Sequence, residues 1–271
     1  MKIIDRLLVI IFNLCLLLTA GITPALILAS SPSYYYEQFE KNGIYSYTDE
    51  NGDEKRKIIR YIGGESNKLA MFSDEQLNII ITHITDYLFA DKESFELRMD
   101  EVYIIGDGVC DGVDIFGEKA VSHMADVKSL MNFAKWTAIV SFITVITLLV
   151  LFIKRKQTRK FLLKYTAVFY SILGVFAVLL CVSSFIEALI LTGGNTKAFS
   201  YFLWKNIHYL LFPFQPHKVE NSILSDALTQ LLTLELFMTA VAVVVATIVL
   251  VLIAWLIGAY VLQKRAKITN K

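Results

Sequence analysis

The sequence predicts an α-helical integral membrane protein: four transmembrane helices, with a small α+β extracytoplasmic domain between the first and second. Hydrophobic residues make up 55% of the 271 residues, and the mean hydropathy is +0.54, both high for a soluble domain. A helix needs roughly 20 apolar residues to cross a hydrocarbon core about 30 Å thick. Four stretches meet this length: Leu7–Leu28, Trp136–Ile153, Tyr165–Leu191 and Leu234–Val261. Because backbone polar groups in lipid must pair within their own segment, these stretches are predicted to be helical.

Basic residues in the short connections predict the orientation, because Lys and Arg concentrate on the cytoplasmic side. Lys2 and Arg6 precede the first stretch, and the C-terminal tail is basic. The connection between the second and third stretches contains no acidic residue. It contains six basic ones: Lys154, Arg155, Lys156, Arg159, Lys160 and Lys164. Both termini are therefore expected in the cytoplasm of a multi-pass cell-membrane protein, with the active site on the outer face.

This orientation divides the chain into eight segments. The membrane helices are expected at residues 1–29, 132–153, 165–191 and 234–263. The extracytoplasmic segments are 30–131 and 192–233, and the cytoplasmic ones are the loop 154–164 and the tail 264–271. A cleaved signal peptide is the alternative for the first helix, with Ile27 and Ala29 at the cleavage site. Its apolar run exceeds the roughly 7–15 residues of a signal peptide, which favours retention.

The first extracytoplasmic segment has the patterns of a small folded domain. Strands at 44–48 and 57–62 flank Asn51-Gly52, a typical hairpin turn. Asp74–Phe89 has helical periodicity and begins at a capping box formed by Ser73 and Gln76. Residues 101–105 are expected to form a strand, and a helix from Glu118 is expected to continue into the second span. Residues 222–232 are expected to form a short helix before the fourth span.

Aromatic residues flank the predicted spans on the outer side. The group at residues 34–39 is expected at the level of the lipid headgroups, and the segment 192–233 is expected to lie flat in the membrane interface. The first extracytoplasmic segment is acidic, with 20 acids against 10 bases by our count between residues 29 and 131. That balance does not favour nucleic-acid binding. Cys110 is alone outside the spans, so no intramolecular disulfide is expected there.

His123 is the strongest candidate for catalysis. It lies about two helical turns before Met131, where the helix becomes apolar, and therefore near lipid glycerol esters. Asp126 follows three residues later, on the same helix face, where it is able to orient the imidazole. A neutral histidine at this depth would suit a general base. The alternative is an ordinary surface histidine close to the membrane.

Further polar residues are candidates for the same outer-leaflet site. His208 lies in the aromatic outer segment, Glu187 in the outer third of the third span, and Asp226 and Glu235 at the fourth. Carboxylates within a membrane are costly and commonly functional. An amphipathic segment is the alternative for His208, and snorkelling, with Lys197 as partner, is the alternative for Glu187. His83 and His217 are expected to be solvated.

No cofactor or metal is expected. Four positions of a calcium-binding loop are matched, by Asp107, Asp111, Gly112 and Glu118, but Val109 occupies a position that needs a side-chain ligand.

The motif His123-Met124-Ala125-Asp126-Val127 resembles that of the bacterial lipoprotein intramolecular transacylases. Phe116 before it, His208 in a later aromatic segment and Asp226-Ala227-Leu228 also match that family. The resemblance extends over nearly the whole chain. The chain departs from the pattern at Ala120, where the family often has an acid, and in a longer outer domain.

The resemblance implies an acyltransferase whose substrates are diacylglyceryl-modified lipoproteins. Its other expected partner is membrane lipid. The sn-2 acyl chain would move to the amino group of the N-terminal cysteine, which gives the lyso-form lipoprotein. His123 would act as base, Asp126 would orient it, and His208 would polarise the ester carbonyl. Two alternatives are a small-solute transporter with Glu187 and Glu235 as a relay, and a non-enzymatic sensor or assembly protein that binds through the outer domain.

Overall fold

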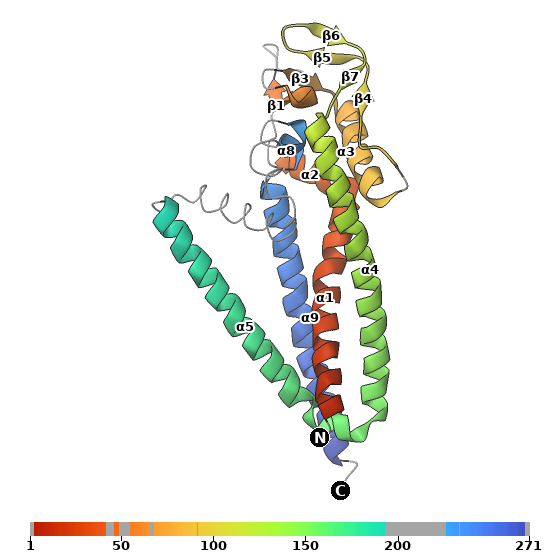
Figure 1. Cartoon of the computed structure of the whole chain (residues 1–271), viewed down its shortest axis with the longest axis vertical. Helices are drawn as coiled ribbons and strands as arrows, with labels where there is room; N and C mark the ends of the chain where they lie inside the picture. Colours follow the sequence, from red (N-terminus) through yellow and green to blue (C-terminus); the bar gives the residue numbers. More distant parts are fainter. Residues whose placement is uncertain are drawn as a thin grey trace. The chain divides into compact units, whose positions relative to one another are not determined.

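Figure 1 shows the computed structural model, which describes residues 3–41, 46–48, 55–65, 68–90, 92–192, 226–232 and 234–268. Among these described residues, four helices are long and apolar enough to cross a membrane, in agreement with the predicted number. The chain divides into two compact units. We call residues 1–25, 134–203 and 241–271 the helical unit, and residues 26–133 and 204–240 the sheet unit.

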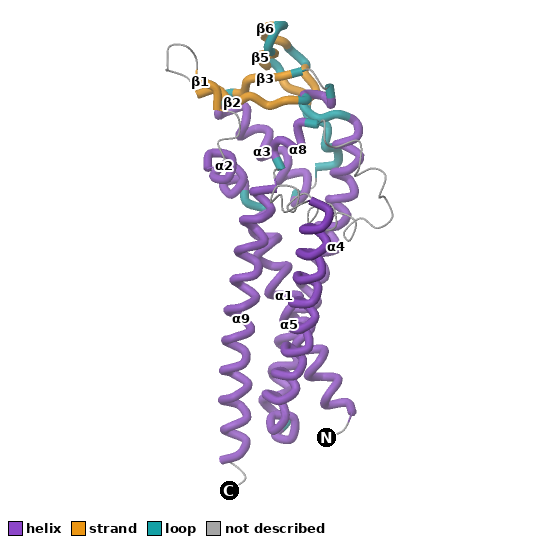
Figure 2. Tube along the Cα trace, turned by 90° about the vertical axis from the view of Figure 1, so that its left-hand side faces the viewer, coloured by secondary structure: helices purple, strands orange, loops and turns teal. Residues whose placement is uncertain are grey.

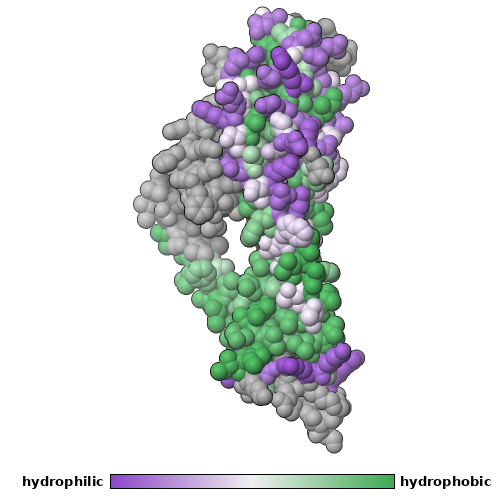
Figure 3. All heavy atoms as spheres, turned by 45° about the vertical axis from the view of Figure 1, so that its right-hand side comes forward, coloured by the Kyte–Doolittle hydropathy of each residue, from purple (hydrophilic) through white to green (hydrophobic). Residues whose placement is uncertain are grey.

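Helices α1 (Ile3–Ala29), α4 (Glu118–Lys154), α5 (Lys156–Thr192) and α9 (Leu234–Ile268) supply the helical unit. Its core is a cluster of buried apolar side chains: Val9, Phe12, Val145, Leu148, Phe152, Leu162 and Ala259. Large apolar side chains such as Ile143, Phe176 and Leu250 are exposed. Figure 3 shows hydrophobic residues covering this part of the surface, as expected of residues that face lipid.

The connection between α4 and α5 differs from the expected loop at 154–164. Helix α4 ends at Lys154 and α5 begins at Lys156, so only Arg155 lies between them. This segment has no glycine or proline, and its Lys, Arg, Gln and Leu residues are strong helix formers. The Arg155 guanidinium lies 3.6 Å from the Asp5 carboxylate, which joins the end of α4 to the start of α1.

Polar side chains also join helices inside the helical unit. Asn13 is fully buried; its amide donates to Val9 O at 2.7 Å and to Thr166 Oγ1 at 3.3 Å. Its side-chain oxygen accepts from Trp255 Nε1 at 3.1 Å. Asn13 therefore connects α1 with α5 and α9 through hydrogen bonds that lipid cannot replace.

The sheet unit contains a five-stranded antiparallel sheet in the order β1-β2-β3-β5-β6. The strands of this sheet are β1 (Ser46–Thr48), β2 (Lys55–Arg60), β3 (Leu69–Phe72), β5 (Val102–Ile104) and β6 (Gly108–Cys110). Strands β4 (Arg98–Met99) and β7 (Val113–Asp114) form a second, two-stranded sheet. The pairing of β1 with β2 confirms the predicted hairpin, although its turn lies outside the described residues. Strand β5 confirms the strand expected at 101–105.

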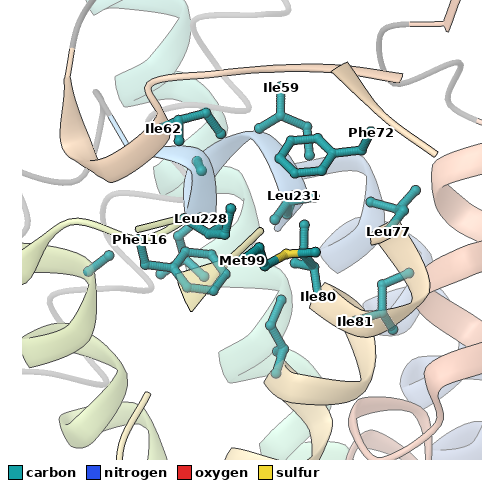
Figure 4. Close-up of a cluster of buried hydrophobic side chains, with 14 of the residues drawn as sticks. Ile59, Ile62, Phe72, Leu77, Ile80, Ile81, Met99, Phe116, Leu228 and Leu231 are labelled. Carbon is teal, nitrogen blue, oxygen red and sulfur yellow. The ribbon is translucent and has the colours of Figure 1, made fainter. Parts of the chain in front are cut away.

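Helices α2 (Pro32–Lys41), α3 (Asp74–Phe89) and α8 (Ala227–Leu231) lie on one side of the larger sheet (Figure 2). Helix α3 begins with the predicted capping box, in which Ser73 and Gln76 each pair with the other's backbone N–H. The buried faces of α3 and α8 meet side chains from β2 and β3 (Figure 4): Ile59, Phe72, Leu77, Ile80, Ile81, Leu228 and Leu231.

The first aromatic group lies on α2 and contributes to this core. Tyr35 and Phe39 are buried, at 5% and 1% exposure, and the Tyr34 hydroxyl donates to Leu236 O at 2.6 Å. These side chains therefore belong to the core of the sheet unit. Their expected position at the level of the lipid headgroups stays a prediction.

Candidate functional site

His123 lies on α4, within the part of the helix that belongs to the sheet unit. Only 8% of its surface is exposed. Its neighbours Ala120 and Met124 are buried in the core, so this face of α4 packs against the unit. The alternative of an ordinary surface histidine is therefore wrong.

Asp126 is half-buried one helical turn after His123. Burial raises the pKa of the Tyr87 phenol, and the negative charge of Asp126 raises it further. The Lys128 ammonium lies 4.5 Å from the centre of the Tyr87 ring and donates to the carbonyl oxygen of Lys92. Asp126 therefore lies in a region where α4 contacts α3 and the segment after it.

His83 was expected to be solvated, and the structure corrects this. It is buried, at 3% exposure, on the inner face of α3. Its Nε2–H donates to Phe95 O at 2.9 Å. Nδ1 then carries the lone pair, and it accepts from the Lys92 ammonium at 2.7 Å. Burial lowers the pKa of His83, and the charge of Lys92 lowers it further, against the bond to Phe95 O and the charge of Asp86. His83 is therefore a neutral core histidine.

Asp226 is almost fully buried, at 1% exposure. Its Oδ1 accepts from the backbone N–H of Leu228 at 2.9 Å, which caps the start of α8. Its Oδ2 accepts from the backbone N–H of Gly117 at 2.9 Å. Burial raises the pKa of this carboxyl, while the two N–H donors lower it. Asp226 was expected beside an outer-leaflet cavity, but both of its oxygens are bonded to backbone.

Of the remaining candidates, the structure describes only the backbone or nothing. Glu187 lies on α5 and Glu235 on α9, and their side chains are outside the described residues. His208 and His217 also lie outside the described residues. The expectation that His208 and the carboxylates share one site with His123 therefore stays a prediction. Among the described residues, no group of three or more His, Cys, Asp or Glu side chains has an arrangement suited to a metal ion.

Two features of this region were not expected from the sequence: the bond between Gly117 and Asp226, and the pairing of His83 with Lys92. A partial signal for the first existed. Gly117 directly precedes the helix predicted from Glu118, and glycine is accepted at the start of a helix. Asp226, in contrast, was expected inside the helix predicted at 222–232, whereas the structure places it at the N-cap of α8. The sequence distance of 109 residues between the two partners hides their pairing.

The fold and the buried histidine define a multi-pass membrane protein with a small α+β unit, whose candidate base is carried by one of its membrane helices. The family model for the lipoprotein intramolecular transacylase Lit matches residues 7–212. The chain belongs to this family of transacylase enzymes. No curated protein sequence shows significant similarity to the chain.

Two solved structures of the membrane integral lipoprotein intramolecular transacylase Lit from Bacillus cereus share the fold. One, of a variant with a histidine-to-arginine substitution, has 12% identity and a TM-score of 0.61, and the match covers 98% of this chain and 95% of that one. The other has 14% identity and a TM-score of 0.52, and covers 100% and 99%. At these identities the likeness supports the fold alone.

Proposed function

We propose that this chain transfers the sn-2 acyl chain of a diacylglyceryl-modified lipoprotein to the free amino group of its N-terminal cysteine. The product is a lyso-form lipoprotein with one O-linked and one N-linked acyl chain. The observation that carries the proposal is the family match over residues 7–212, combined with the burial of His123 within the motif that resembles the family. Membership of a transacylase family disfavours the transporter and the non-enzymatic sensor.

The reaction needs no nucleophile from the protein, because the attacking amine and the ester belong to one molecule. The amine nitrogen attacks the sn-2 ester carbonyl, and its proton passes to His123 as general base. The tetrahedral intermediate then loses the glycerol oxygen as the C–O bond breaks, and His123 returns the proton to that oxygen. Because the site holds the amine and the ester carbonyl together, much of the entropy cost of bringing these two groups into contact is avoided in the reacting step.

The other candidate residues would support this base. Asp126 orients the His123 imidazole from the next turn of α4. His208 binds or polarises the ester carbonyl, which stabilises the developing oxyanion. Glu187 and Glu235 stay supporting candidates near the outer leaflet. The basic residues before the first span, in the segment 154–164 and in the tail 264–271 support an orientation with both termini in the cytoplasm and the site on the outer face.

The test is the acylation state of lipoproteins in cells that express each variant at an equal level. His123→Gln retains most of the side-chain volume, which matters because the position is buried. We expect the rate of lyso-form production to fall about 10²–10⁴-fold, the usual contribution of a general base. His123→Ala should lose the lyso-form as well. Asp126→Asn should cost less, and His208→Ala should fall between the two or match His123→Gln.

His83→Gln is the matched control, since it replaces a second buried histidine of the same unit. It should retain the lyso-form product. Mass spectrometry of the lipoprotein N-terminal peptide gives the ratio of lyso-form to diacylglyceryl form. Wild-type amounts of lyso-form from His123→Gln would show that the catalytic assignment is wrong.

A further inference from the structure

Three segments of the sheet unit meet with almost no space between their backbones. The first is the turn at Gly63-Gly64, where φ is +65° and +79°, a conformation that side chains rarely adopt. The second is Gly117, directly before α4. A Cβ on Gly117 would lie 3.0 Å from Gly63 O and 3.1 Å from Gly64 Cα. Only glycine fits at this crossing, because both neighbouring atoms belong to the backbone.

The third segment supplies the carboxylate of Asp226, which closes the crossing. A Cβ on Gly117 would lie 2.9 Å from Asp226 Oδ2. The same oxygen accepts the Gly117 N–H, while Oδ1 caps α8. Hydrogen bonds to a carboxylate are among the stronger ones, and negative charge at a helix N-terminus is favourable. Capping α8 needs only one oxygen, so the bond to Gly117 is an additional link from α8 to the start of α4.

The proposed base, His123, lies on the same helix that begins directly after Gly117. His123 lies six residues after Gly117, about 9 Å along the helix axis at about 1.5 Å per residue. Within so short a stretch a helix moves as one body. The position of its first turn therefore sets both the depth and the rotation of His123 and Asp126.

We infer that Asp226 is a positioning residue of the acyl transfer, which acts through the Gly117 backbone to hold the first turns of α4, and with them His123, in register. This rests on the proposed function. Asp226 itself exchanges no proton with the substrate, because its two oxygens accept backbone N–H groups within the core. Its loss should therefore lower the rate of the chemical step and leave substrate binding unchanged.

The first test variant is Asp226→Asn in the full-length protein. Asparagine caps helices as well as aspartate does, so its oxygen can keep the α8 cap. Its NH₂ group then faces the Gly117 N–H, and two donors cannot bond. Asp226→Ser is the second variant, because a serine hydroxyl caps α8 and is too short to reach Gly117. The two variants remove the same link in different ways.

The assay follows turnover of a synthetic diacylglyceryl lipopeptide in lipid–detergent micelles. We expect both variants to lower kcat about 10–100-fold, the scale of a displacement near 1 Å, with KM unchanged within about twofold. The dependence of kcat on pH should keep the limb that belongs to the base, because His123 is displaced and not replaced. His123→Gln, in contrast, should lose that limb.

Ile81→Val controls for loss of stability alone, since Ile81 is buried in the same core on α3. It should lower the melting temperature and leave kcat near that of the wild type. Asp226 variants whose kcat falls no further than that of Ile81→Val, at a similar loss of melting temperature, would overturn the inference. A raised KM with unchanged kcat would also overturn it. Wild-type activity of His123→Gln would instead show that His123 is not the base, and the inference would fall with that assignment. No turnover of the lipopeptide by the wild type would overturn the proposed function itself.

Discussion

Gly117→Ala tests whether the crossing of the three backbone segments is as close as the structure shows. The added Cβ would lie 2.9 Å from Asp226 Oδ2, 3.0 Å from Gly63 O and 3.1 Å from Gly64 Cα. The carboxylate has some freedom to move, but the two backbone atoms are held by the η1 turn (Ile62–Gly64), where the Gly63 N–H donates to Ile115 O at 3.1 Å. The substitution must therefore push α4 away from the turn.

The expected cost follows from three contributions. Overpacking costs about 1–3 kcal/mol, and weakening the bond to Asp226 adds about 1 kcal/mol. The lower entropy of the unfolded alanine chain returns about 0.4–1 kcal/mol. The net loss of about 1–3 kcal/mol in the free energy of unfolding corresponds to a melting temperature lower by about 3–10 °C for a chain of this size.

The assay is thermal unfolding of the purified protein in detergent, with the same micelle composition for each variant. Gly174→Ala on α5 is the control, because the Cβ that it adds meets nothing within 4 Å beyond the neighbouring backbone of its own helix. Alanine in a helix interior is more stable than glycine by about 0.5–1 kcal/mol, so this control should match or exceed the wild type. A Gly117→Ala protein as stable as the wild type would refute the reasoning about the crossing.

Three further predictions concern other parts of the molecule. Because its folded pKa lies below the ordinary value of 6.5, His83 contributes stability that is present above about pH 6.5. That contribution is lost as pH falls through the lowered pKa; a melting-temperature series should show the decline, and His83→Gln should flatten it. Asn13→Leu removes the acceptor of Trp255 Nε1 and should cost about 1–2 kcal/mol, seen as a lower melting temperature in detergent; an unchanged value would show that these hydrogen bonds contribute nothing. Gln157→Cys should resist impermeant thiol reagents in intact cells and react after permeabilisation, and labelling from outside would reverse the proposed orientation.

The local elements of the sheet unit could be predicted because their signals lie within a few residues. The capping box of α3 needs only Ser73 and Gln76, and the hairpin of β1 and β2 needs a turn between two strands. The prediction for His83 failed for the opposite reason. The polar residues beside it in sequence suggested that the side chain is exposed to solvent. In the structure, the centres of the His83 and Phe95 rings lie 5.4 Å apart, and Phe95 belongs to the segment after the helix.

The candidate site likewise combines features that local sequence predicts with features that depend on contacts between distant segments. The spacing of His123 and Asp126 indicated a base on a helix, and the family match supports the motif. The burial of His123 depends on how α4 packs, so the surface alternative stayed open until the tertiary structure excluded it. Asp226 was expected only as nearby support, since the sequence does not show that Gly117, 109 residues away, is its hydrogen-bond partner.

The amino-acid sequence by itself determined the class of protein and its four membrane helices, because the hydrocarbon core requires long apolar stretches that any folded arrangement must respect. It also determined where the helix with His123 runs, because that helix continues without a break into the second span. Only the tertiary structure decided which polar groups are buried and what they bond. The link from Asp226 to Gly117 and the burial of His83 arise from contacts between segments distant in the chain, whose pairing depends on how the whole sheet unit packs.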